Sequence, residues 1–538
     1  MDAPAPNDDG SRAPILVFVV ALVVGALAIL TYFGRLRWFA LDDWDFLADR
    51  RLGDVGDLFR AHNEHWSTVP VVAWRLIWSI DGLHHYATYQ ALLVGAHVAV
   101  VVLLRIVMRR AGVRPWTATL VALALLLFGA GSQNILWAFQ IGFVGSMAFG
   151  LGQLLLLDHE GPVDRRDAIG LGLGLLAIMS SGIGVSMVAA AGVAALLRRG
   201  WRVALLHTVP LAAAYLVWWS IEQPSTVGHP PPASTFEVVR QVAAFAATGV
   251  AATFGALASV PYLGFVLVAV TGAGLVLAWR RLTWSDWCRQ GATVVALLVG
   301  LVVFFVISGS GRWWSGADYA RTSRYLYLGA AFVLPAIGVA ADALMVRWRR
   351  AAPAVVVLLA VGIVGNVGAL RDARQADEVR YPPARALVLN LADRSIGDDV
   401  DPRTEPDPRA NPGLTIGWLR QVRAEGKVPD PPPLSADEEL LLPVRLGFLQ
   451  SFAPPPSDCR SLTGKLDVRP AKGTVYGIAG AGDRLSVAPL DDAGAPTAPP
   501  VKFDIDHGRR FTVQLDGLHL QLKPGILGQS ITFCQESA

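Results

Sequence analysis

The sequence predicts a polytopic α-helical membrane protein of about eleven transmembrane helices with a small C-terminal extracytoplasmic β domain. Of its 538 residues 53% are apolar and 17% charged, and the mean hydropathy is +0.44. Soluble domains are nearer a quarter charged. Apolar runs long enough to cross a bilayer recur as far as residue 370, and short alternating runs broken by Gly, Pro and Asp follow residue 458.

The first apolar run extends from Pro14 to Phe33 behind a polar N-terminal head. At 1.5 Å per residue such a run spans roughly 30 Å, the thickness of the hydrocarbon core. No small-residue cleavage motif follows it, so we expect an uncleaved first membrane helix.

Ten further runs have the length and composition of membrane spans. They cover residues 86–108, 115–131, 138–157, 167–181, 183–198, 202–220, 260–279, 291–308, 325–346 and 353–370. A cytoplasmic N-terminus places the arginine clusters between these runs on the cytoplasmic side, as the positive-inside rule favours. The bias toward Ala, Arg and Pro, with very few lysines, is typical of a GC-rich bacterial source. We therefore predict a bacterial plasma membrane, crossed many times, with the C-terminal domain outside the cytoplasm.

The stretch from Phe236 to Ser259 is apolar but interrupted by Gly249 and Gly255. Counting it as a full span would place the arginines at 280 and 281 outside. We therefore interpret it as an interfacial or re-entrant segment.

The composition divides the chain into a transmembrane domain at 1–370, a Pro-rich and partly helical connector at 371–457, and a β-sandwich-like domain at 458–538. Cys459 and Cys534 flank this last domain, which the topology places where disulfides persist. Joining them closes a loop of 75 residues (534 minus 459), a stabilisation of about 4 kcal/mol in the chain-entropy model. We predict that disulfide, with Cys288 as a reduced cytoplasmic thiol.

The first external loop carries the acidic stretch FALDDWDFLADR, from Phe39 to Arg50. Asp42, Asp43 and Asp45 are interleaved there with aromatic residues, a mixture suited to a sugar or a lipid headgroup. A carboxylate beside another carboxylate can have a raised pKa, which suits a general base. The alternative is that the acids solvate the loop and cap a helix.

The same loop continues with HNEHW, which supplies His62, Glu64, His65 and Trp66 as candidate substrate-binding residues. Two histidines and a carboxylate could also hold a divalent cation. The spacing differs from HExxH and no third ligand cluster is evident, so we predict no metal site, and a divalent cation is only an alternative.

A second external segment, SGSGRWWSGADYARTSRYLY, precedes the span at 325–346. Its arginines, Arg312, Arg321 and Arg324, run against the positive-inside trend, and the guanidinium group fits a phosphate. Trp313 and Tyr325 are rings suited to a sugar face or a prenyl chain. Interfacial anchoring of the helix end is the alternative.

Many spans, an acidic pair after the first helix and a C-terminal external domain together resemble the GT-C superfamily of membrane glycosyltransferases. That superfamily includes protein O-mannosyltransferases and actinobacterial arabinosyl- and mannosyltransferases. The resemblance covers roughly residues 1–370 and implies a polyprenyl-phosphate sugar as donor and an Asp of the first external loop as base. Asp42 and Asp43, in LDDWD, occupy the matching positions, and of the two we favour Asp43 as the base.

We therefore expect inverting transfer of a sugar to an extracytoplasmic acceptor, a cell-envelope glycan, glycolipid or protein, without an organic cofactor. Two other classes stay open, a transporter or flippase of lipid-linked sugars and a non-catalytic scaffold for envelope assembly. The net charge of +3 is too small and too scattered to indicate nucleic-acid binding.

Overall fold

The computed structural model describes residues 9–50, 53–223, 234–280, 283–393, 400–408, 410–451, 459–462, 464–479, 484–504, 510–524 and 531–536. It divides the chain into two compact units that interleave along the sequence. Unit 1 is Met1–Arg37, Leu52–Ala73 and Ala87–Asp377, and unit 2 is Trp38–Arg51, Trp74–Tyr86 and Glu378–Ala538. The acidic loop at 38–51 thus belongs to the same unit as the C-terminal region.

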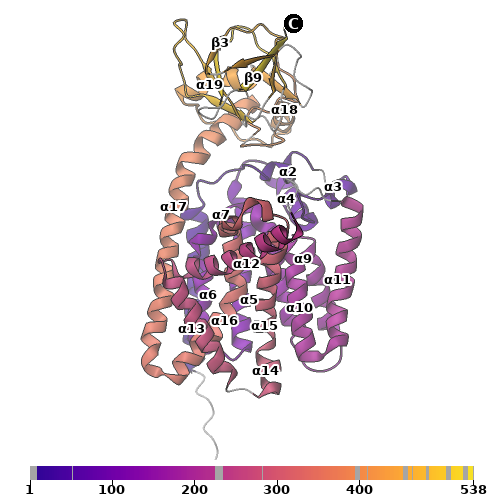
Figure 1. Ribbon diagram of the computed structural model, residues 1–538, viewed down its shortest axis with the longest axis vertical. Helices are drawn as coiled ribbons and strands as arrows, with labels where there is room; N and C mark the ends of the chain where they lie inside the picture. The colour runs from indigo at the N-terminus through magenta and orange to yellow at the C-terminus, as the bar shows by residue number, and fades with distance from the viewer. Residues whose placement is uncertain are drawn as a thin grey trace, which may run out of the picture. The chain divides into compact units, whose positions relative to one another are not determined.

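Unit 1 is a helical bundle (Figure 1). Its α-helices are α1 (Asp9–Ala28), α3 (Val55–Phe59), α5 (Tyr86–Arg110), α6 (Pro115–Leu126), α7 (Ser132–Leu136), α8 (Ile141–Leu157), α9 (Arg165–Ile178), α10 (Ile183–Arg199), α11 (Trp201–Glu222), α12 (Thr235–Ala258), α13 (Leu263–Trp279), α14 (Trp284–Gln290), α15 (Ala292–Ser310) and α16 (Ser323–Arg347). Short π or 3₁₀ turns complete it at Ile29–Phe33, Gly129–Gly131, Ala138–Gln140, Trp313–Ser315, Ala317–Arg321 and Arg349–Ala351. Two helices, α4 (Thr68–Asp81) and α17 (Ala352–Asp393), continue from unit 1 into unit 2.

Eight of the described helices are long and apolar enough to cross a membrane, or nine if the bent pair of Pro115–Leu126 and Gly129–Leu136 is one span. The predicted total of eleven is not confirmed. Three predicted spans, α9, α10 and α13, are too short, with 14, 17 and 17 residues, whereas α12 is added to the predicted set. A straight span needs about 20.

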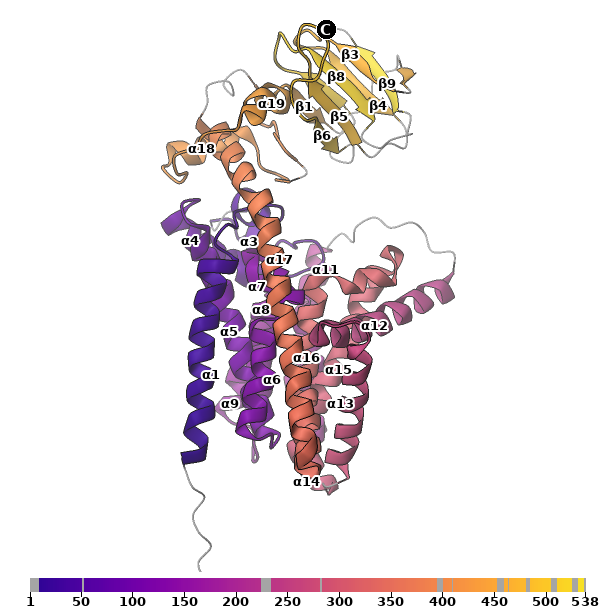
Figure 2. The ribbon, with the colours of Figure 1, turned by 90° about the vertical axis from the view of Figure 1, so that its left-hand side faces the viewer.

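Helix α12 is continuous through the segment that the sequence analysis interprets as interfacial or re-entrant. It contacts α13, α15 and α16 and lies at an angle to them (Figure 2). Gly249 does not break the helix, because it serves packing: a Cβ there would lie 2.2 Å from the ring of Phe305. By length and composition α12 is itself one of the eight candidate spans.

Unit 2 begins with a short helix in the acidic loop, α2 (Asp43–Leu47). Its other helices are the end of α17, α18 (Ile416–Ala424) and α19 (Ala436–Leu446). Helix α17 runs on beyond residue 370, where the sequence analysis places the start of the connector, and it contains Pro382 and Pro383. Aromatic contacts fasten the acidic loop within this unit, since Trp44 lies edge-on to Trp418, with ring centroids 6.1 Å apart.

The described residues of the C-terminal region contain nine strands, which form two antiparallel sheets. They are β1 (Phe448–Ser451), β2 (Cys459–Leu462), β3 (Leu466–Val468), β4 (Val475–Ala479), β5 (Arg484–Pro489), β6 (Val501–Asp504), β7 (Arg510–Val513), β8 (Leu520–Pro524) and β9 (Ile531–Glu536). The orders are β1-β7-β4-β9-β2 and β3-β8-β5-β6. Inward side chains of both sheets share one buried core with α19, as period-two alternation dictates, and the prediction of a small C-terminal β region is confirmed.

Strands β2 and β9 pair so that Cys459 lies directly opposite Cys534. Residues opposite each other in an antiparallel pair have Cα atoms about 4.5–5.5 Å apart, within the range that a disulfide spans. The side chains of both cysteines lie outside the described residues, so the disulfide stays a prediction. Cys288 is the free cysteine of the described side chains.

Candidate functional site

The HNEH stretch folds into a tight turn of unit 1 between α3 and α4. His62 and His65 exchange backbone hydrogen bonds of 3.0 and 2.9 Å, and Asn63 between them has a φ of 50°. Asparagine tolerates this left-handed conformation better than most residues. The turn leaves Glu64 at its tip.

Arg312 reaches the same place from the loop that follows α15. Its Nη2 donates to Glu64 Oε2 over 3.2 Å, across 248 positions of sequence. The side chains are 21% and 14% exposed, so water screens the pair far less than a surface pair. The structure thus brings together two of the predicted segments.

A second arginine, Arg324, lies at the start of α16. Its Nη2 donates to the hydroxyl of Tyr319 over 2.9 Å, and its guanidinium carbon lies 5.5 Å from the ring centroid of Tyr325. Its Nε is buried and has no hydrogen-bond partner among the described residues. We name Glu64, His65, Arg312 and Arg324 the loop-one cluster.

His65 lies within electrostatic range of the other three members of the cluster. Burial lowers its pKa to about 4, and the charges of Arg312 and Arg324 act in the same direction while Glu64 opposes them. The backbone N–H of Gly182 donates to its Nδ1 over 3.3 Å, so Nδ1 is unprotonated and the neutral ring carries its proton on Nε2. The cluster at neutral pH therefore holds two positive charges and one negative charge.

The aromatic residues predicted beside this turn mostly support it. Trp66 is 6% exposed and stacks on Trp218, with centroids 5.3 Å apart and planes 4° apart. Its Nε1 donates to Thr68 Oγ1 over 2.7 Å, and the ring of His62 lies 5.1 Å from that of Phe139. A ring covered in this way holds the turn in place, and Trp66 offers no open face for a sugar.

Arg321 and Trp313 lie apart from these hydrogen bonds. Arg321 pairs with Asp318 over 2.9 Å, where both side chains are exposed, and Trp313 begins a 3₁₀ turn and is partly exposed. Arg321 also lines a cavity of about 980 Å³ in unit 1. The rest of its wall is mainly small and apolar residues of α12 and α13, with Val302 of α15 and Leu326 of α16. The three arginines predicted as one phosphate site therefore have different neighbours.

The acids of the first loop belong to unit 2. Asp43 starts α2 and is fully buried, and its Oδ2 accepts the backbone N–H of Ala40 over 2.9 Å. Asp45 pairs with the buried Arg50 at 3.0 Å. Asp42, just before the helix, is partly exposed. Its side chain makes no capping hydrogen bond to the described residues of α2, and Asp43 accepts from Ala40, which precedes the helix.

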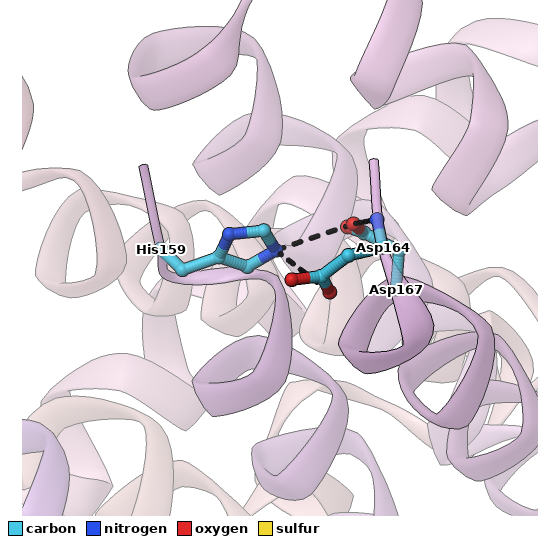
Figure 3. A group of neighbouring side chains, drawn as sticks. All are labelled: His159, Asp164 and Asp167. Atoms are coloured by element: carbon cyan, nitrogen blue, oxygen red, sulfur yellow. Dashed lines mark hydrogen bonds and ion pairs between the residues drawn. The ribbon is translucent and has the colours of Figure 1, made fainter. Parts of the chain in front are cut away.

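A cluster that the sequence analysis misses connects α8, α9, α10 and α11. His159, Asp164 and Asp167 point toward one another, with possible ligand atoms all within 4.8 Å (Figure 3). Asp167 accepts from His159 Nε2 at 3.2 Å, from His207 Nε2 at 3.0 Å and from Arg199, which uses both terminal nitrogens.

These bonds argue against a metal ion at this place. A cation would have to displace Arg199 and His207 from the carboxylate of Asp167, and Arg199 is 4% exposed and would be left without its partner. The available sequence signal was the pair Asp164 and Asp167, which form a capping box at the start of α9. It indicates a helix start, and only the fold shows that Arg199 and His207 come to the same carboxylate.

Comparisons with protein-family models, with curated proteins and with solved structures find no match for this chain. Membership of the GT-C superfamily stays a hypothesis. The case for a function therefore depends on the charges and cavities of the chain itself.

Proposed function

We propose that the chain is a membrane glycosyltransferase that moves a sugar from a polyprenyl-phosphate donor to an extracytoplasmic acceptor. The observation that carries this proposal is the loop-one cluster, which contains two arginines, Arg312 and Arg324, and one carboxylate, Glu64, that pairs with Arg312. A partly buried excess of one positive charge favours an anionic ligand.

A phosphate fits this excess better than a carboxylate does. Arginine presents a planar fork of donors that matches phosphate oxygens, and a phosphate offers enough acceptor atoms for two such forks. Arg324 Nε has no hydrogen-bond partner among the described residues, so its N–H can donate to a phosphate oxygen. Glu64 would then act as the counter-ion that an incoming phosphate partly replaces.

The cavity lined by Arg321 supports a ligand that is amphiphilic. Its volume of about 980 Å³ lies at the upper end of the range for ligand sites, and its wall is mainly Ala, Val and Gly residues. An isoprenoid chain buries its surface in such a groove, and one arginine at the wall suits a charged headgroup.

The proposed reaction needs two contributions from the chain. A general base, for which the resemblance offers Asp42 and Asp43, accepts the proton of the acceptor hydroxyl as the hydroxyl oxygen bonds to the anomeric carbon. The bond from that carbon to the phosphate oxygen breaks, the configuration inverts, and Arg312 and Arg324 stabilise the charge on the departing polyprenyl phosphate. Of the two acids at the matching positions, exposure favours Asp42 over Asp43 as the base.

The direct test is transfer from a radiolabelled polyprenyl-phosphate sugar by the purified chain in nanodiscs. Removing the base, as Asp42→Asn or Asp43→Asn, is expected to lower turnover by about 10²–10⁴-fold. Asp318→Asn, at an exposed carboxylate paired with an exposed arginine, is the control and keeps activity. Full turnover in both base variants would remove the proposed mechanism.

The donor site is tested separately through decaprenyl phosphate alone. We expect it to raise the melting temperature of the wild-type chain, and Arg312→Met and Arg324→Met to abolish that rise. If both variants kept the full rise, the arginines would not bind the phosphate. A chain that binds decaprenyl phosphate but transfers no sugar from any donor would fit a flippase.

A further inference from the structure

Unit 2 contains a smaller cavity of about 230 Å³ that the proposed reaction does not use. Among the described residues it is formed by α17 between Arg380 and Leu387, by Asp407, Ala410 and Asn411, by α19 and by Ala40 of the acidic loop. Its polar wall consists of Arg380, Tyr381, Asp407, Asn411, Glu438 and Arg445.

The charges of this wall are balanced and loosely paired. Arg445 Nη1 lies 3.3 Å from Asp407 Oδ2, and its Nε lies 3.6 Å from Glu438 Oε2, beyond hydrogen-bond length. That Nε and Oε2 are buried, and neither has a hydrogen-bond partner among the described residues. Buried polar atoms in this state usually indicate a missing partner, a water or a ligand.

We propose that this cavity binds a single neutral sugar ring. Two arginines and two carboxylates leave the polar wall uncharged overall, so neither a phosphate nor a free cation gains by entering. A hydroxyl group both donates and accepts, so it can serve an arginine and a carboxylate together.

The size and the apolar lining of the cavity also agree with a single sugar ring as the ligand. It is smaller than the roughly 300–1,000 Å³ of sites for drug-sized ligands, so one ring fits and a disaccharide does not. Pro383, Ala384 and Leu387 give one side an apolar surface for the C–H face of a ring. A sugar carries both kinds of surface, hydroxyls at its edge and C–H groups on its faces.

An occupant of this cavity would contact the residues that hold the acidic helix. Asn411, in the cavity wall, accepts from Trp44 Nε1 over 2.8 Å, and the adjacent carbonyl of Ala410 accepts from Leu41 N over 2.9 Å. Sugar binding therefore stabilises the loop that carries Asp42. The binding itself requires no turnover, so this inference goes beyond the proposed transfer reaction.

The test uses the full chain in nanodiscs and saturation-transfer NMR with a panel of neutral methyl glycosides. The panel contains methyl α-D-mannopyranoside, methyl α-D-glucopyranoside, methyl β-D-galactopyranoside and methyl α-D-arabinofuranoside, with inorganic phosphate and glycine as charged competitors. We expect at least one glycoside to bind and neither competitor to displace it.

Two kinds of variant locate the binding. Glu438→Gln removes a charge of the wall, and Ala384→Leu fills the cavity while keeping its ion pairs; each is expected to weaken binding at least tenfold. Glu439→Gln, at the exposed neighbour on α19, is the matched control. Melting temperatures equal to wild type in the Ala384→Leu variant show that its loss of binding does not come from unfolding.

Three results would overturn the proposal: no signal from any glycoside, binding unchanged in both Glu438→Gln and Ala384→Leu, or displacement by phosphate or glycine. The stabilisation by decaprenyl phosphate depends on Arg312 and Arg324 in unit 1, so we expect these variants to leave it unchanged. Failure of the sugar cavity can thus be told apart from failure of the donor site.

Discussion

The carboxylate of Asp167 offers the sharpest test of how the helices of unit 1 are held together. Asp167→Asn removes the charge that Arg199 faces, with side chains 1% and 4% exposed. Breaking a buried pair by removing one partner costs about 3–5 kcal/mol, because the other charge stays buried without compensation. Net stabilities are about 5–15 kcal/mol, so we expect a melting temperature lower by several degrees.

The control is the exposed pair of Asp318 and Arg321, in which the carboxylate is 90% exposed. Asp318→Asn is expected to cost at most about 1 kcal/mol. The double variant Asp167→Asn/Arg199→Met, which removes both buried charges, is expected to recover part of the loss. Equal shifts for Asp167→Asn and Asp318→Asn, measured by thermal unfolding in one detergent, would refute the reasoning.

Three further predictions concern pH, redox state and packing. The pKa of the His65 side chain is about 4 in the folded chain and 6.5 in the unfolded chain. Between these pH values only the unfolded state takes up the proton. The stability of the fold therefore falls as the pH falls from about 6.5 to about 4. His65→Gln should flatten this part of a plot of the free energy of unfolding against pH by at most about 3 kcal/mol, and an equal slope in the variant would contradict it. Non-reducing mass spectrometry should find a peptide joining Cys459 to Cys534, and free thiol at either position would contradict the bond. Gly249→Ala should destabilise the chain by about 1–3 kcal/mol, because a buried ring lies 2.2 Å from the new Cβ, whereas Gly255→Ala on the same helix meets nothing within 4 Å and is expected to cost nothing.

The helical layout was predictable because long apolar runs have few alternatives in a chain of this composition. Span count was harder to predict. Gly249 in an apolar run suggests an interruption, and in α12 it is instead the point where Phe305 packs closely. A glycine that breaks a helix and one that allows a close contact look alike in sequence, and only the neighbouring helix distinguishes them.

The candidate site, too, was predictable from the sequence only in part. Arginines outside the cytoplasmic clusters are visible in sequence, and Arg312 and Arg324 do lie beside the HNEH turn. Which acid is buried depends on a local turn, where Ala40 donates to Asp43 and leaves its neighbour partly exposed. The Asp167 network was beyond reach, because its partners Arg199 and His207 are 32 and 40 positions away and nothing local relates them.

Two of the ionic groups of unit 1 lie near opposite ends of α8. Phe139 and Phe143, at its start, contact the histidines of the HNEH turn, and His159 follows its last residue. A helix of 17 residues separates the two groups by about 25 Å. The two groups have similar residue composition but differ in net charge. From this difference we infer that one group stabilises the fold and the other binds a ligand.

At the His159 end, two arginines, Arg166 and Arg199, face two carboxylates, Asp164 and Asp167, and the charges balance within the group. The loop-one cluster contains two arginines and one carboxylate, Glu64, which pairs with Arg312, and the excess positive charge favours an anion from elsewhere. A group that is balanced by itself stabilises the fold, and one that is not has a reason to bind a ligand. Decaprenyl phosphate should therefore stabilise Asp167→Asn by as much as it stabilises wild type, since the cation it binds lies at the other end of the bundle. If Asp167→Asn instead gained extra stabilisation from the lipid, Arg199 would be an anion site and this assignment of roles would be wrong.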